Sequence, residues 1–249
     1  MPTKVQLFAT CLSEQFYPGV LEKTVTLLER LGVEVSFPPG QTCCGQPHFN
    51  SGFHQEAKSI ARQWLRAFSL EADEDTAIVA PSGSCVDMVR HHYRELFPEG
   101  SEEYAMALAL GERTFELTEF LVEQMGVVNV GAYFPGKVTY HASCHQLRGL
   151  GVREAPKKLL QNVRGLELVP LEGEEVCCGF GGAFSVIYPE VSRAMLAEKV
   201  RNIEDNGAEA VASCDAGCLM NIGGGLRRAG SKVRAMHIVE ILASTGEAG

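Results

Sequence analysis

Residues 174–184 are EEVCCGFGGAF, in which two adjacent cysteines are followed by a glycine. The same arrangement occurs at residues 40–49, GQTCCGQPHF. Neighbouring side chains of a strand point to opposite faces of a sheet, so adjacent thiols suit a turn, where both can reach one centre. A glycine directly after the pair favours such a turn because it tolerates a positive φ. The two stretches therefore indicate two thiol sites, one in each half of the chain.

The spacing of the cysteines indicates an internal duplication. Four cysteines of the first half recur 133 or 134 residues later; they are Cys11, Cys43, Cys44 and Cys85, matched by Cys144, Cys177, Cys178 and Cys218. The ninth cysteine, Cys214, has no partner, because Pro81 stands 133 residues before it. Self-similarity at one offset is the signature of a repeat. We expect an N-terminal repeat over 1–128 with a helical insertion near 98–113, a linker at 127–136 and a C-terminal repeat over 136–249.

Short apolar runs alternate with helical patterns in each half. Strands are expected at 4–11, 76–85, 137–144 and 209–218, and helices at 22–32 and 190–207, with similar amphipathic segments closing the halves at 117–126 and 236–245. Alternating strands and helices are typical of βαβ units with parallel sheets, whose sites lie at the carboxyl ends of the strands. The sequence therefore predicts an α/β fold of two pseudo-repeated lobes, each a small parallel sheet flanked by helices, with the cysteines at the carboxyl ends of the strands.

Composition narrows the possible partners. The chain has 249 residues, 45% of them hydrophobic, and a formal net charge of −9. That charge argues against a nucleic-acid backbone or an anionic membrane as partner. No apolar run reaches the roughly 18–20 residues of a membrane helix, and the N-terminus lacks a secretory pattern, so we expect a cytoplasmic protein. Nine cysteines in a reducing compartment indicate metal or redox chemistry rather than disulfides.

The two thiol sets differ in size. The first half offers four thiols, which suit a zinc ion or an iron–sulfur cluster. The second half offers five, one more than a tetrahedral zinc or an ordinary cubane cluster requires. Because thiolates carry negative charge, we expect the helices after the two cysteine pairs to point backbone N–H groups toward them.

The cysteine pattern resembles the cysteine-rich CCG domain family, which includes the cysteine-rich subunit of heterodisulfide reductase and the iron–sulfur subunit of glycolate oxidase. The similarity is strongest to the lactate utilization members. It runs through nearly the whole chain and is carried by LFATCL, FPPGQTCCGQPHFNSG, PSGSC, HASCHQLRGLGV, CCGFGGAFSV and CLMNIGGGL. The resemblance implies an iron–sulfur subunit of a multi-subunit cytoplasmic complex that oxidises L-lactate to pyruvate, together with ferredoxin-like partner subunits.

The same resemblance implies a set of cluster ligands. In the heterodisulfide reductase relatives a CCG motif supplies five cysteines to a noncubane four-iron cluster. By position this role falls on Cys144, Cys177, Cys178, Cys214 and Cys218. With Pro81 in place of a fifth cysteine, the first half would bind zinc, a four-ligand cluster or nothing through Cys11, Cys43, Cys44 and Cys85. Cys214 and Cys218 are separated by three residues instead of two, and Cys218 is the firmer assignment because Cys85 is its counterpart.

Two other functions stay open from the residues alone. One is a scaffold with structural zinc and no redox centre, and the other is a thiol–disulfide redox protein. The residues also leave open whether catalysis takes place on this chain and which small 2-hydroxy acid is oxidised.

Several further residues have both a simple and a functional interpretation. His48, His141 and His145 are either ordinary loop histidines or donors beside the thiols. Arg148 and Arg153 belong either to a solvated loop or to a clamp for a carboxylate. The stretch GGGLRRAG at 223–230 lacks the Gly-Lys-Ser/Thr ending of a phosphate loop, so we expect its glycines to permit close packing.

Overall fold

The computed structural model describes residues 4–69 and 76–246. The chain divides into two compact units, Met1–Gly126 and Val127–Gly249. Each unit contains one four-stranded sheet in which all strand pairs are parallel. The prediction of two pseudo-repeated α/β lobes is therefore confirmed. None of the helices in these residues is long and apolar enough to cross a membrane.

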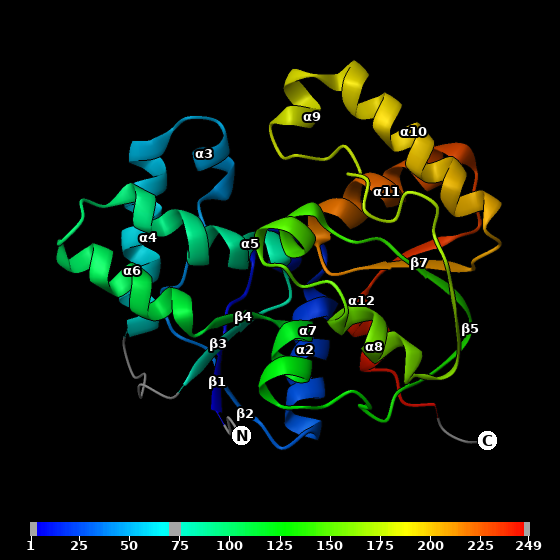
Figure 1. Cartoon of the computed structure of the whole chain (residues 1–249), viewed down its shortest axis with the longest axis horizontal. Coiled ribbons are helices and arrows are strands. Elements are labelled where there is room, and N and C mark those ends of the chain that lie inside the picture. The colour runs from blue at the N-terminus through cyan, green and yellow to red at the C-terminus, as the bar shows by residue number, and fades with distance from the viewer. Residues whose placement is uncertain (1–3, 70–75, 247–249) are drawn as a thin grey trace. The chain divides into compact units, whose positions relative to one another are not determined.

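In the first unit the strands lie in the order β2-β1-β3-β4 (Figure 1). They are β1 (Lys4–Leu7), β2 (Glu34–Ser36), β3 (Ala77–Ala80) and β4 (Thr114–Glu116). The chain passes from β1 to β2 on one side and then returns to β3 on the other side of β1. The direction of winding therefore reverses between β1 and β3, where sheets of this type form a crevice at their carboxyl end.

Helices of the first unit connect these strands. They are α1 (Cys11–Phe16), α2 (Pro18–Arg30), α3 (Gln46–Asn50), α4 (His54–Ser69), α5 (Gly83–Asp87), η1 (Met88–His92), η2 (Tyr93–Leu96), α6 (Glu102–Glu112), α7 (Leu117–Glu119) and η3 (Phe120–Gln124). The rings of Phe8, Trp64 and Phe68 pack together with centroid separations of 4.2 to 5.5 Å. This buried aromatic group holds α4 against the carboxyl end of β1.

The second unit repeats this topology with the order β6-β5-β7-β8. Its strands are β5 (Tyr133–Tyr140), β6 (Arg164–Val169), β7 (Ala210–Ser213) and β8 (Arg234–His237), and its helices are η4 (His145–Gly149), α8 (Ala155–Gln161), α9 (Phe184–Ile187), α10 (Pro189–Asp205), α11 (Ala216–Ala229) and α12 (Ile238–Leu242). Register is repeated as well: Val5 pairs with Ala77 in the first sheet and Val138 with Ala210 in the second, each 133 residues further on.

The glycine run at 223–230 lies on α11 and its C-cap, so it is no phosphate loop. A Cβ on Gly225 would lie 2.8 Å from Cγ2 of Val200 and 3.1 Å from Cδ1 of Leu196, both on α10. The expected close packing is confirmed, because only a residue without a side chain allows α10 to approach at that point.

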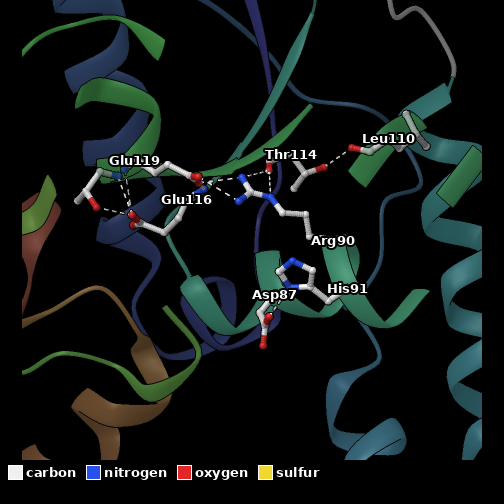
Figure 2. A network of polar contacts seen from close by, with 8 residues as sticks. Asp87, Arg90, His91, Leu110, Thr114, Glu116 and Glu119 are labelled. Carbon is white, nitrogen blue, oxygen red and sulfur yellow. Dashed lines mark hydrogen bonds and ion pairs between the residues drawn. The ribbon is translucent and has the colours of Figure 1, made fainter. Parts of the chain in front are cut away.

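A buried polar network in the first unit joins η1 to β4 and α7 (Figure 2). Arg90 donates to the Thr114 carbonyl at 2.6 and 2.9 Å and to both carboxylate oxygens of Glu119 at 3.0 and 2.8 Å. Glu116 caps α7 by accepting from the backbone of Thr118 at 2.8 Å. Burial raises the pKa of Glu116 to about 7.

Several expected elements differ from those observed. Strand β1 ends at Leu7, so that Cys11 begins α1, and Cys85 and Cys218 lie inside α5 and α11. The apolar runs continue past the strand ends because the turns that lead into the helices are themselves buried.

Short strands and the linker also differ from expectation. Strands β2, β4, β6 and β8 have no counterpart among the strand ranges expected from the sequence, and β8 occupies the start of the segment 236–245. Strand β5 begins at Tyr133, inside the expected linker, because a register shift between Tyr133 and Gly136 extends its pairing with β6.

Candidate metal centres

Each set of thiols lies at the winding reversal of its sheet. Cys11 follows β1 and Cys85 follows β3, which are neighbours, while Cys43 and Cys44 come from the loop after β2. In the second unit the same places are taken by Cys144 after β5, Cys218 after β7, and the pair Cys177 and Cys178 after β6. The topology thus brings together cysteines from different elements that are 32 to 74 positions apart in the sequence, as in other open α/β sheets.

Four sulfur atoms of the first unit form two close pairs. The Sγ atoms of Cys11 and Cys43 are 3.5 Å apart, and those of Cys44 and Cys85 are also 3.5 Å apart. All four thiols are free, since a disulfide would require about 2.05 Å. The backbone N–H of Gly45 donates to Cys43 Sγ at 3.4 Å, which supplies the backbone donor expected after the cysteine pair.

The pKa values of the cysteines in the first unit differ from one another. Hydrogen bonds from the Cys11 and Cys44 thiols and from Gly45 N–H, with a contribution from the charge of His48, lower the pKa of Cys43 to about 3. Hydrogen bonding to Cys43 and burial raise the pKa of Cys11, and hydrogen bonding to Cys43 and Cys85 raises that of Cys44. The thiolate form is thus favoured at Cys43, and the protonated form at Cys11 and Cys44. A metal ion would replace those protons, because metal binding requires deprotonated sulfur.

Electrostatic conditions in the second unit follow the same pattern. Hydrogen bonds from Cys144 and Cys178, with the backbone N–H of Gly179 at 3.4 Å, lower the pKa of Cys177 to about 2. Hydrogen bonding to Cys177 raises the pKa of both Cys144 and Cys178. Cys178 and Cys218 also belong to the apolar cluster between β7, α10 and α11, which fixes their positions. Here the helix α9 begins only at Phe184, so the loop amide of Gly179 acts as donor instead of the start of a helix.

The fifth cysteine lies beside a tyrosine. Cys214 directly follows β7, is fully buried, and has its Sγ 3.5 Å from the hydroxyl of Tyr140. The close group of donors, with ligand atoms within 4.8 Å of one another, consists of Cys178, Cys218 and His141. Cys218 therefore belongs to this group of possible ligands, whereas Cys214 contacts Tyr140.

His141 differs from an ordinary loop histidine. Its side chain is fully buried, and neither ring nitrogen makes a hydrogen bond of ordinary geometry within the described residues. Burial and the charge of Lys199 lower the pKa of His141 to about 3, against the opposing effects of Cys177 and the Glu174 backbone. A neutral imidazole with an uncommitted nitrogen is a suitable metal ligand. The position, at the end of a strand and three residues before a cysteine, was the signal available in the sequence.

The two arginines after Cys144 have structural partners. Arg148 donates to the Glu175 carbonyl at 2.9 Å, and Arg153 forms an ion pair with the Glu175 carboxylate. They therefore secure the loop before Cys177, which favours the simple interpretation over a clamp for a substrate carboxylate.

Both thiol sets fit a sulfur-bound metal. Near each set lie buried polar atoms without a hydrogen-bond partner in the described residues; they are Tyr93 Oη in the first unit and His141 Nδ1 and Nε2 in the second. Buried polar atoms are normally paired, so such orphans near a site point to a group that completes it. Thiolate-rich ligand sets favour zinc or iron–sulfur clusters over cations that prefer oxygen ligands.

Comparison with known proteins agrees with the duplication. The model of the cysteine-rich CCG domain matches residues 5–90 and again residues 138–223, 133 positions further on. The chain therefore belongs to the CCG cysteine-rich domain family. Among its relatives are proteins named lactate utilization protein A: that of Exiguobacterium sp. is 52% identical over 96% of both chains, and that of Oceanobacillus iheyensis is 47% identical over 99% of both. The protein of the same name from Geobacillus sp. is 50% identical and covers 97% of this chain and 99% of its own.

The fold also occurs among solved structures. The crystal structure of a hypothetical protein from Helicobacter pylori superposes on all of this chain with a TM-score of 0.65 at 12% identity. The chain spans half of that protein's length. At this identity the likeness supports the architecture alone.

Proposed function

We propose that this chain is the iron–sulfur electron-transfer subunit of a cytoplasmic multi-subunit complex that oxidises L-lactate to pyruvate. Its membership of the CCG family and the name of its relatives support the substrate. The single observation that carries the redox role is the gathering of Cys144, Cys177, Cys178 and Cys218, with Cys214 nearby, at the carboxyl end of the second sheet. Oxidation of lactate releases two electrons and two protons, and the other subunits, of ferredoxin type, would exchange the electrons with this chain.

Residues of the second unit would perform distinct tasks in this role. A bound iron–sulfur cluster supplies one-electron transfer. The lowered pKa of Cys177 favours its thiolate form, and the amide of Gly179 donates to its sulfur, a contact that would tune both metal affinity and reduction potential. His141 faces Cys178 and Cys218 with an uncommitted nitrogen. The Cys178 thiol is buried, which keeps water away from that sulfur atom.

The first unit supplies four thiols, and we assign to it a zinc ion or a cluster with four ligands. The Sγ pairs at 3.5 Å are close to the ligand separation of about 3.8 Å around a tetrahedral zinc with Zn–S bonds of about 2.3 Å. Its role would be to hold α1, α3 and α5 together at the end of the sheet, since structural zinc contributes directly to folding.

Anaerobic purification with iron, sulfide and zinc analysis and electron paramagnetic resonance tests the proposal. The expected result is iron and sulfide bound to the wild-type chain, with loss of both in Cys177→Ser and Cys218→Ser. A reconstituted wild-type protein that stays colourless and free of iron would contradict the redox role. Zinc alone, with unfolding on chelation, would establish the scaffold function in its place.

Thiol–disulfide exchange is a second candidate, favoured by the half-buried pairs Cys11 with Cys43 and Cys144 with Cys177. In each pair a low-pKa thiolate lies beside a protonated thiol, which is the arrangement that dithiol oxidoreductases use. Mass spectrometry of metal-free protein equilibrated in glutathione buffers tests this function. Reversible disulfides at the poise of the cytosol would support it, and thiols that remain reduced throughout would exclude it.

A further inference from the structure

The two units carry different side chains at equivalent places beside their thiols. The first such place is the end of the central strand. The backbone N–H of Phe8 donates to the Val79 carbonyl at 2.9 Å, and that of His141 donates to the Ala212 carbonyl at 2.9 Å. Both members of the second bond lie 133 residues after those of the first. Phe8 and His141 therefore occupy the same position in the repeated fold.

The second place lies on the long helix that follows each cysteine pair, α4 or α10. A Cβ on Gly45 would contact the Ala57 carbonyl and Ile60, and a Cβ on Gly179 would contact the Ser192 carbonyl and Met195. These helix residues correspond at an offset of 135. Seven residues beyond Ala57 is Trp64, and seven beyond Ser192 is Lys199. Both side chains are buried, so the same helical position holds an indole in one unit and an ammonium in the other.

Aromatic rings back the thiols of the first unit. Phe8 and Trp64 pack edge to face with centroids 5.4 Å apart, and Trp64 packs against Tyr93 at 5.5 Å. The pKa of Tyr93 is raised by burial and then by the charges of Cys44, Cys43 and Cys85, which shows that this group lies close to the sulfur atoms. On this side the thiols therefore face uncharged aromatic side chains.

Basic groups back the thiols of the second unit. Lys199 is 2% exposed, and its ammonium donates to the Gly173 carbonyl in the loop that leads to Cys177. Burial lowers its pKa, while the charges of Cys178, Cys218 and Cys177 act in the opposite direction. The neighbouring α10 residues Leu196 and Val200 pack in the same buried cluster as Cys178 and Cys218, so the helix carries Lys199 close to these thiols. The unit with the extra cysteine is also the unit with the buried cation.

We propose that Lys199 is a positioning residue whose buried ammonium compensates the negative charge of a metal–thiolate centre in the second unit. At the equivalent position of the first unit Trp64 provides no such charge. The inference rests on the proposed function, since it requires a metal at these thiols. Four thiolates around a divalent ion leave a net charge of −2, and in a buried site the interaction with a nearby cation is strong. The second site is therefore built for a more anionic centre than the first.

Cobalt binding to the full, metal-free chain tests the role of Lys199. All variants carry Cys43→Ser, which disables the first site, so that the sulfur-to-cobalt absorbance reports the second. Lys199→Met removes the charge and the hydrogen bond to Gly173, and Lys199→Gln removes the charge but keeps a donor. Lys232→Met, at an exposed lysine of the same unit, is the matched control. Competition with a chelator gives the cobalt affinity, and circular dichroism gives the unfolding midpoint of the metal-free protein.

We expect both Lys199 variants to bind cobalt about 10- to 100-fold more weakly, as is usual for residues that support metal ligands, with the control unchanged. The unfolding midpoint of metal-free Lys199→Met should not fall, because an apolar residue replaces a buried charge. Unchanged affinity in Lys199→Met, or wild-type affinity in Lys199→Gln, would overturn the inference while leaving the proposed function intact. If metal-free Lys199→Met has a lower unfolding midpoint than the chain with Lys199 intact, the cobalt affinity of Lys199→Gln decides the test. Absence of cobalt absorbance from the chain with Lys199 intact would remove the metal site and this inference with it.

Discussion

Gly179 shows how much of the second site depends on one residue. Its φ is +85°, which side chains rarely adopt, and its amide donates to Cys177. A Cβ at this position would lie 2.7 Å from the Ser192 carbonyl oxygen, a backbone atom that cannot move without moving α10. Gly45 has a similar φ of +80°, but its nearest neighbour would be the Ile60 side chain at 3.4 Å. The two glycines therefore have the same backbone conformation but differ in how much room they leave for a side chain.

Gly179→Ala is expected to destabilise the protein by about 3 kcal/mol or more, since backbone strain of about 1–2 kcal/mol adds to the clash. Gly182→Ala is the matched control, because its φ of +60° imposes strain while no atom lies within 4 Å of the new Cβ. Denaturant unfolding measures both, and Gly45→Ala should fall between them. Equal losses in Gly179→Ala and Gly182→Ala would show that α10 adjusts freely.

At the scale of the element, α7 depends on a buried carboxyl group. Glu116 caps this helix and is fully buried, and the neighbouring Glu119 is engaged by Arg90 (Figure 2). In the second unit His237 and Glu240 form the equivalent capping box. Both units thus have a capping box at the start of this helix, but the N-cap residue differs. It is a buried carboxylic acid in the first unit and a buried histidine in the second.

Glu116→Gln should change how stability depends on pH. Because burial raises the pKa of Glu116 from its ordinary 4.5 to about 7, the folded state keeps a proton that the unfolded chain loses between these values. Stability from this group is therefore highest below pH 4.5, falls as pH rises to about 7, and then stays level. Glu116→Gln should remove roughly 2–3 kcal/mol of that decline. Urea unfolding at pH 5 and pH 8 measures it.

The exposed Glu112 provides the comparison for this experiment, since Glu112→Gln removes a carboxyl group from the same part of the first unit. Its pH dependence should match that of the wild type. A Glu116→Gln protein with the wild-type decline would show that Glu116 is ionised throughout the range.

At the scale of the molecule, the repeat places one complete thiol set in each unit. The contacts and electrostatic interactions among the cysteines of each set lie within its own unit. The two centres should therefore be lost independently.

Cys43→Ser is expected to remove the metal of the first unit and leave the iron and sulfide of the second, whereas Cys177→Ser should do the reverse. Each serine removes the thiol of its set whose pKa is lowered, with little change in volume. Metal and sulfide analysis of the anaerobic proteins measures the outcome. Loss of all metal from either single variant would mean that one centre draws on both units.

Local patterns in the sequence were sufficient for the repeat, the alternation of strands and helices, and the thiols themselves. The spacing of the cysteines recurs at a constant offset along the sequence, so the repeat can be recognised without a structure. Strand and helix periodicities are properties of short segments. The expected helices at 22–32 and 190–207 accordingly correspond to α2 and α10. The three-residue strand β4 carried too short a pattern to be predicted.

Only the tertiary structure decided what surrounds the sulfur. In the sequence His141 is typical of a loop and Lys199 of an exposed helix face. In the structure both are buried near Cys178 and Cys218, which lie on other segments of the chain. Arg153, a candidate clamp in the sequence, is bound to Glu175. These outcomes depend on how the crossovers fold back over the sheet. Burial and long-range electrostatics arise from that packing, and no local pattern encodes them.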